Sequence, residues 1–105
     1  MFARNVSVRL KPNTLTEFTQ IFQKEILPLM MKQAGFRDEL MLANGNATHI
    51  TAISLWDSKE QADDYEKTSY PQVLKSLEKV LDGAPKMYMN TVITSTSHKV
   101  SAVAA

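Results

Sequence analysis

Apolar and polar residues alternate along four stretches of this chain, a pattern that predicts β-strands with one buried face. The predicted strands cover residues 3–11, 36–44, 47–56 and 86–96. In the first strand the apolar side is formed by Val6, Val8 and Leu10. Asn44-Gly45 is expected to join the second and third strands as a hairpin turn, because both residues adopt positive φ readily.

Apolar residues at helical spacing predict a helix after the first strand and a helical region after the third. The first helix begins with a capping box at Thr14-Leu15-Thr16-Glu17. Its apolar stripe consists of Leu15, Phe18, Phe22, Ile26 and Leu29. Pro28 removes a helix hydrogen bond and is expected to kink the last turns or end them early. The later region divides into a short helix over 58–66, with a capping box at Ser58 and Gln61, and a helix from about 69 that Gly83 ends.

This order of elements, β-α-β-β-α-β, predicts a ferredoxin-like α+β fold with one antiparallel sheet and helices on one of its faces. Residues 1–105 are expected to form a single domain, with 97–105 as a loose C-terminal arm or a docked strand. The uncovered sheet face needs water or a partner. Alternation along the third strand assigns Ile53 and Leu55 to the helices. The opposite face is expected to carry Ala52, Ser54 and Trp56, together with Asn5.

Composition excludes several kinds of site. The 105 residues include no cysteine, which excludes disulfides, thiolate metal sites and Cys nucleophiles. Two isolated histidines, His49 and His98, make no metal site. The 12 basic and 11 acidic residues are dispersed, so we expect no nucleic-acid partner. Without a signal-peptide pattern or an apolar run of membrane length, the protein is expected to be soluble and cytoplasmic.

The segment ISLWDSKEQADDYEKTSYPQVLKSL, residues 53–77, resembles antibiotic-biosynthesis-monooxygenase-type domains of the dimeric α/β-barrel superfamily. The matching features are a strand ending in Trp, an acidic residue followed by Ser, a short helix and an aromatic-Pro segment. With the first strand and the long first helix, the resemblance covers most of residues 3–96. It implies a homodimer closed through the uncovered sheet faces, with a pocket in each subunit between sheet and helices. Some members oxidise polyphenols or quinols with molecular oxygen and no cofactor.

Haem-degrading relatives use an Asn on the first strand, the Trp and a His further along the chain. Asn5 and Trp56 match the first two. At the third place this chain has Tyr65 and Glu66, and neither can bind iron as a neutral imidazole. The resemblance therefore implies no haem, and the residues show no equipment for another metal or redox cofactor.

The candidate catalytic residues are Asn5 and Trp56, and the candidate substrate-binding residues are Arg9, Ser54 and Tyr65. Trp56 either stacks on a planar substrate as a pocket wall or fills the gap between sheet and helix. Asn5 either polarises a phenolate or carbonyl oxygen or satisfies backbone groups near the sheet end. Arg9 either neutralises an anionic substrate or is solvated. Tyr65 would supply a phenolic hydroxyl, whereas Tyr70 fits the core stripe of its helix.

Three functions fit the sequence. The first is a cofactor-independent monooxygenase that oxidises a small polyphenol- or quinol-type aromatic with oxygen. Such a protein need only bind the substrate as its anion, position oxygen and exclude water, so it requires few special residues. The second is a non-catalytic small-molecule binder, and the third is a dimeric structural or stress-associated protein.

Overall fold

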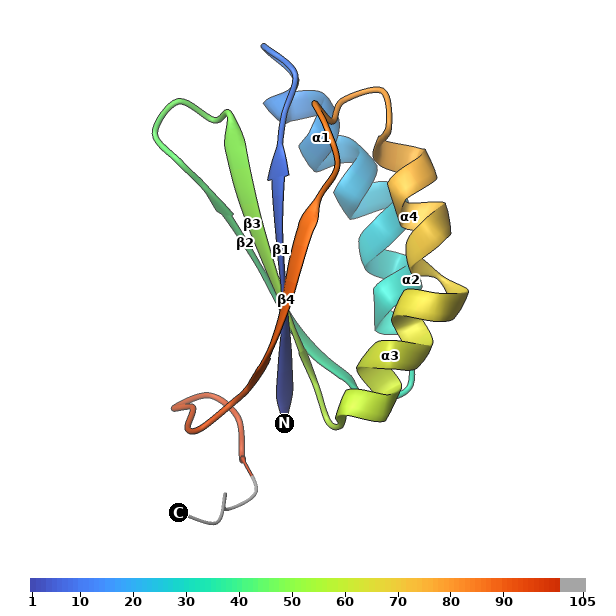
Figure 1. Ribbon diagram of the computed structural model, residues 1–105, viewed down its shortest axis with the longest axis vertical. Helices are drawn as coiled ribbons and strands as arrows, with labels where there is room; N and C mark the ends of the chain where they lie inside the picture. The colour runs from blue at the N-terminus through green and yellow to red at the C-terminus, as the bar shows by residue number, and fades with distance from the viewer. Residues whose placement is uncertain (101–105) are drawn as a thin grey trace.

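One sheet and one layer of helices form the structure, a computed structural model that describes residues 1–100 (Figure 1). The elements in chain order are β1 (Phe2–Arg9), α1 (Leu15–Ile21), η1 (Phe22–Ile26), α2 (Leu27–Met31), β2 (Phe36–Ala43), β3 (His49–Trp56), α3 (Lys59–Thr68), α4 (Tyr70–Leu77) and β4 (Lys86–Thr91). All strand pairs are antiparallel, in the order β2-β3-β1-β4. This arrangement confirms the ferredoxin-like α+β fold.

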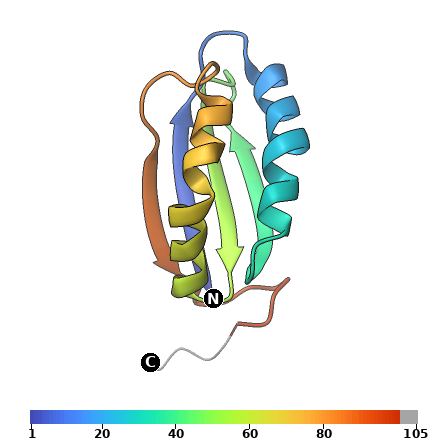
Figure 2. The same ribbon diagram turned by 90° about the vertical axis from the view of Figure 1, so that its right-hand side faces the viewer.

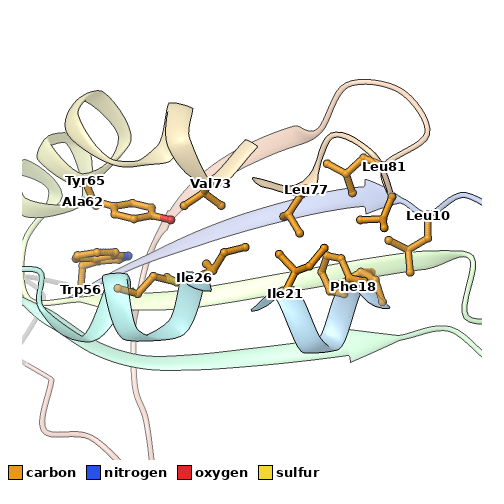
Figure 3. Packing of buried hydrophobic residues seen from close by; sticks show 13 residues of the cluster. Leu10, Phe18, Ile21, Ile26, Trp56, Ala62, Tyr65, Val73, Leu77 and Leu81 are labelled. Carbon is orange, nitrogen blue, oxygen red and sulfur yellow. The ribbon is translucent and has the colours of Figure 1, made fainter. Parts of the chain in front are cut away.

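The helices cover one face of the sheet only. Figure 2 shows both helical segments, α1 to α2 and α3 to α4, in front of the same face of the sheet. We call this the inner face, and the uncovered one the outer face. The core lies between the inner face and the helices, where apolar side chains from both layers meet (Figure 3).

The first helical segment changes its hydrogen-bonding pattern just before Pro28. Within the π-helix η1 the N–H of Leu27 donates to the carbonyl of Phe22, five residues back. The wider turn gives room to the proline ring, and the segment continues to Met31 instead of ending early. The wider turn also keeps residues four apart in line over several successive steps. In a regular helix of 3.6 residues per turn, such residues drift gradually around the axis. Met30 is therefore buried, and Leu29 of the predicted stripe packs half-buried against the core.

The two predicted capping boxes have different outcomes. The Ser58 hydroxyl accepts the N–H of Gln61 at 3.2 Å, as expected. The Gln61 side chain accepts from that hydroxyl, also at 3.2 Å, rather than reaching the backbone of Ser58. Thr14 makes no side-chain cap, and its hydroxyl donates to the carbonyl of Lys11 at 2.7 Å. Its backbone, with φ −112° and ψ 6°, lacks the extended geometry that Ser58 has and that is typical of N-cap residues.

Two turns differ from expectation. The hairpin between β2 and β3 exists, but its positive φ, 54°, falls on Ala47 rather than on Asn44 and Gly45. The side-chain oxygen of Asn44 accepts two backbone N–H groups of the loop, at 2.9 and 3.0 Å, and these bonds fix a longer connection. Gly83 has a φ of 91°, yet α4 ends at Leu77, so this glycine shapes the loop before β4 and not the helix end.

A β-bulge at Arg37 decides which way the side chains of β2 point. Phe36 pairs with Trp56, but the next paired residue, Asp38, is opposite Leu55. The extra residue turns every later side chain of the strand to the opposite face. Glu39 therefore pairs with Ser54 beneath the helices. The outer face receives Leu40 and Leu42, which are 53% and 49% exposed.

The face assignment expected for β3 is wrong. Trp56 is 0% exposed, and its ring centroid lies 5.0 Å from that of Tyr65 in α3, so it faces the helices. Ala52 and Ser54 share this inner face, and Ile53 and Leu55 lie on the outer one. Both faces of this strand carry large apolar side chains, so alternation alone did not distinguish them. Asn5 pairs with Ile53 and lies on the outer face, opposite to Trp56.

The fourth strand is shorter than predicted, and residues 92–100 form no strand. His98 fastens this segment to β2, since its Nε2 lies 2.8 Å from Oδ2 of Asp38. This hydrogen bond holds the pKa of the Asp38 carboxyl below its usual value. The rest of the expected arm, residues 101–105, lies outside the described residues.

Candidate functional site

A cavity of about 50 Å³ lies between the inner face of the sheet and the helices. Its position agrees with the pocket that the family resemblance implied. Most of its wall is apolar, formed by Val6, Val8, Phe18, Phe22, Ile26, Met30, Met41, Ile50, Ala52, Val73 and Leu77. The polar side chains gather at one part of it and are Arg4, Glu39, Ser54, Tyr65 and Tyr70. The site is an apolar hollow with one polar end.

Three of the polar side chains form a row across the sheet. Arg4 of β1 is directly opposite Ser54 of β3, and Ser54 is directly opposite Glu39 of β2. All three side chains point toward the helices, Glu39 because of the bulge described above. The row thus carries a cation at one end, a hydroxyl in the middle and a carboxyl at the other end.

Arg4 is a buried cation, only 3% exposed. Its guanidinium carbon lies 4.0 Å from the ring centroid of Tyr70 and 5.4 Å from that of Tyr65, so aromatic faces supply much of its stabilisation. The nearest carboxylate is that of Glu66, 3.5 Å from Nη2, a long contact. Its Nε has no hydrogen-bond partner among the described residues. Arg4 therefore retains a donor that an acceptor in the cavity could use.

Glu39 carries the complementary free group. Its Oε2 is buried and has no hydrogen-bond partner in the part of the chain that the structure describes. Burial raises the pKa of the Glu39 carboxyl to about 8, against the lowering effect of the Arg4 charge and with a small raising effect from Asp38. Near neutral pH this carboxyl is mostly protonated, and the polar row carries a net positive charge.

Tyr65 and Trp56 form a rigid backing to the polar row. The ring of Tyr65 stacks over that of Trp56, and its hydroxyl points toward Val73 (Figure 3). Burial raises the pKa of Tyr65 to about 12, so the phenol stays protonated and can donate. The indole N–H of Trp56 donates to Oγ of Ser54 at 2.9 Å. Trp56 is thus held behind the site and positions two residues that line it.

The structure brings together only part of the predicted site. Ser54 and Tyr65 line the cavity. Trp56 does not reach it and fills the space between sheet and helix, the second of its two predicted placements. Asn5 and Arg9 lie on the outer face. The expected pocket with Asn5 and Trp56 side by side is therefore wrong, because the two residues occupy opposite faces of the sheet.

Sequence reasoning missed Arg4 and Glu39. A signal was present for Arg4, since it precedes Val6 and Val8 on the same alternation and so belongs to the buried side of β1. A charged residue on the apolar side of a strand is rarely buried unless paired or functional. No comparable signal existed for Glu39, whose inward direction depends on the bulge at Arg37.

Within residues 1–100, no group of three or more His, Cys, Asp or Glu side chains could hold a metal ion. The polar row offers one carboxyl and no imidazole, so its chemistry is that of hydrogen bonds and charge. None of the helices that the structure describes has the length and apolar character to cross a membrane.

The model of a protein family described as antibiotic biosynthesis monooxygenase matches residues 1–75 of the chain. These residues include β1 to β3, most of the helical layer and all five polar residues of the cavity. No curated protein matches the chain.

Solved structures of similar fold include a putative antibiotic biosynthesis monooxygenase from Bordetella bronchiseptica, with a TM-score of 0.78 and 12% identity over 89% of this chain and 97% of that one. A monooxygenase of Streptomyces coelicolor in complex with the ligand nanaomycin D has a TM-score of 0.77 and 16% identity over 90% and 88% of the two chains. A Nitrosomonas europaea protein of unknown function has a TM-score of 0.76 and 14% identity over 90% and 91%. At these identities the likeness shows the fold alone.

Proposed function

Because this chain belongs to the antibiotic biosynthesis monooxygenase family, we propose that it oxidises a small polyphenol- or quinol-type aromatic with molecular oxygen, using neither metal nor flavin. The observation that carries the proposal is Arg4, a buried cation with an unused N–H at the polar end of an apolar cavity. The Streptomyces coelicolor protein of similar fold, with nanaomycin D bound, supports the class of ligand.

The arrangement suits a substrate that must lose a proton before it reacts. The apolar wall takes up the ring system, and Arg4 faces an oxygen at its edge. A cation beside a phenol favours the anion and lowers its pKa, and a charge-assisted hydrogen bond adds to this effect. The electron-rich anion is the form that reacts with oxygen. The role of the protein is then to hold the anion and to exclude water.

The chemistry balances without an outside reductant. In an anthrone-type substrate the reacting CH₂ group becomes a carbonyl. One atom of O₂ enters that carbonyl, and the other leaves as water with both hydrogens. The substrate itself supplies all the electrons that oxygen consumes, so no residue of this chain needs to be redox-active.

The cavity must widen to take such a substrate. At about 50 Å³ it is far below the roughly 300 Å³ at which small-molecule pockets usually begin. Phe22 and Ile26 of η1 form part of its wall. A π-helical turn departs from the regular hydrogen-bond ladder and is frequent at functional sites. We assign the opening movement to this turn, which would carry both side chains away from the sheet.

We also propose that two copies of the chain associate through their outer faces. Leu40, Leu42 and Tyr88 are 53%, 49% and 60% exposed. Leu40 and Leu42 point outward because of the bulge, and Tyr88 is paired with Asn5 of the same face. A two-fold axis would place the outer face of one copy against the same face of the second copy, and these side chains would be buried between the two sheets.

The test is oxygen uptake by purified, metal-stripped protein with a panel of anthrone- and quinol-type substrates. We expect acceleration over the buffer reaction, and at least a tenfold loss of kcat/KM in Arg4→Met. Arg9→Met is the matched control, because Arg9 lies on the same strand but on the outer face. No acceleration with any substrate would replace the enzyme by a non-catalytic binding protein, and equal losses in the two variants would remove Arg4 from the proposed mechanism.

A further inference from the structure

The two unused polar atoms of the cavity lie at opposite ends of one row. Nε of Arg4 and Oε2 of Glu39 both lack a partner among the described residues. Their strands are separated by β3, whose Ser54 stands between them. With about 4.8 Å between neighbouring strands, the two backbones are roughly 10 Å apart. One cation and one carboxyl are thus held apart in the same apolar hollow instead of forming an ion pair.

The surroundings leave both groups available. Arg4 is held by the rings of Tyr65 and Tyr70 and by a long contact to Glu66. This contact uses Nη2 of Arg4 and leaves Nε free. Ser54 is already engaged, since it accepts from Trp56 at 2.9 Å and directs its own hydroxyl to the carbonyl of Arg4 at 3.5 Å. Buried donors and acceptors are seldom left unpaired in folded proteins. Here a bound molecule with two oxygens would pair both.

We infer that the cavity recognises its ligand at two points, with an ionised oxygen on Arg4 and a second oxygen function on the carboxyl of Glu39, and so selects monoanions of dihydroxy- or hydroxy-keto aromatics. This inference rests on the proposed function for the ligand class and adds a requirement on the substrate. A phenol with a single oxygen would satisfy only one end of the row.

Charge decides how Glu39 meets the second oxygen. The titratable and charged groups that act on it are Arg4 of β1, Asp38 of β2 and Tyr65 of α3. With a pKa of about 8, the carboxyl donates a hydrogen bond at pH 7 and leaves the row with a net positive charge. Above pH 8 it ionises, loses its proton for donation and adds a negative charge. Binding of a monoanion must therefore weaken through this pH range.

The experiment uses coloured probes in oxygen-free buffer. 4-Nitrocatechol and 2-nitrohydroquinone carry two hydroxyls, adjacent or opposite, and 4-nitrophenol carries one. Their anions have distinct absorption, so titration with the full-length protein gives a Kd for each ionised form. We expect at least one two-oxygen probe to bind about tenfold more tightly than 4-nitrophenol at pH 7, the effect of one additional buried hydrogen bond. Its affinity per monoanion should fall about tenfold between pH 7 and 9.5.

Variants at one position separate the two roles of the carboxyl. Glu39→Gln keeps a donor without a titrating proton, so it should retain the two-oxygen preference and lose the pH dependence. Glu39→Met should lose both. Arg4→Met should weaken all three probes, with circular dichroism confirming that each variant is folded. The inference is overturned if wild-type protein binds the probes equally or not at all, or if the pH dependence persists in Glu39→Gln.

Binding and oxidation can fail separately. Because the probe titrations exclude oxygen, the probes are not oxidised and their behaviour tests recognition alone. Two-point binding without oxygen uptake on any substrate would refute the proposed function and support this inference. Oxygen uptake that is unchanged in Glu39→Met would support the proposed function and refute this inference.

Discussion

The guanidinium of Arg4 stacks on the ring of Tyr70, with 4.0 Å between the guanidinium carbon and the ring centroid. Arg4 is only 3% exposed, so this contact operates with little water around it. A cation over an aromatic ring in a desolvated place contributes about 2 kcal/mol. Tyr70 therefore does more than fill the stripe of its helix, because it keeps a charge inside the protein.

Replacing Tyr70 by Leu should lower the free energy of unfolding by about 2 kcal/mol, since the cation loses its closest aromatic face. Tyr70→Phe keeps the ring and serves as the control, with a change of less than about 0.5 kcal/mol. Urea denaturation followed by circular dichroism measures both. Equal losses in the two variants would show that the hydroxyl, and not the ring, stabilises Arg4.

Ser54→Ala should destabilise the protein by about 1–3 kcal/mol, because the buried indole N–H of Trp56 loses its acceptor. The same change in a Trp56→Phe background, where no donor is left to satisfy, should cost clearly less. The four unfolding free energies form a double-mutant cycle. An interaction energy near zero would contradict the role assigned to this hydrogen bond.

The pH dependence of stability should report Glu39. Its carboxyl has an ordinary pKa of 4.5 when unfolded and a pKa of about 8 when folded. Between these values only the folded state binds the proton. The contribution of Glu39 to the free energy of unfolding therefore falls as pH rises through this window, and it stays constant above it. Below the unfolded pKa the group is protonated in both states and contributes no difference.

Glu39→Gln removes this titration. The free energy of unfolding of the variant minus that of wild type should rise by about 2 kcal/mol between pH 5 and pH 9. This rise is smaller than the full pKa shift implies, because solvent reaches part of the side chain. Other ionising groups are common to both proteins, so the difference between the two stability profiles isolates Glu39. Parallel profiles from pH 5 to 9 would refute the raised pKa.

Association through the outer face can be tested with one charge. Leu42→Lys should shift the mass in sedimentation equilibrium from twice the chain mass to the 11.8 kDa of a single chain, because burying a lysine charge in an apolar contact is costly. Met31→Lys is the matched control, since Met31 is also exposed, at 67%, but belongs to α2 on the helical side. A wild-type protein that sediments as a monomer at micromolar concentration would exclude the proposed dimer.

The fold could be predicted because its signals are local. Strand alternation, helical spacing and the Ser58 cap each depend on residues close in sequence, and together they fix the order of the elements. The errors arose where a choice depended on distant parts of the chain. Ile50 and Ile53 lie on opposite faces of β3, and only pairing with β1 decides which of them is buried.

The candidate site was harder to predict for the same reason. Ser54 and Tyr65 were found by residue type and position along the chain. Asn5 was placed beside Trp56 through a parity argument that used the wrong face. Glu39 was missed because it belongs to the run Arg37-Asp38-Glu39, and three consecutive charged residues give no sign that a bulge turns one of them beneath the helices.

The unpaired Arg37 also says which changes of length this strand tolerates. Deleting Arg37 would leave Phe36, Asp38, Glu39 and Leu40 opposite the same residues of β3, so every side chain would keep its face. A one-residue slip that paired Arg37 with Leu55 would instead turn Leu40 and Leu42 beneath the helices and Glu39 out to water. The polar row and the apolar outer face therefore depend on one register, and a change of that register would alter ligand chemistry and self-association together.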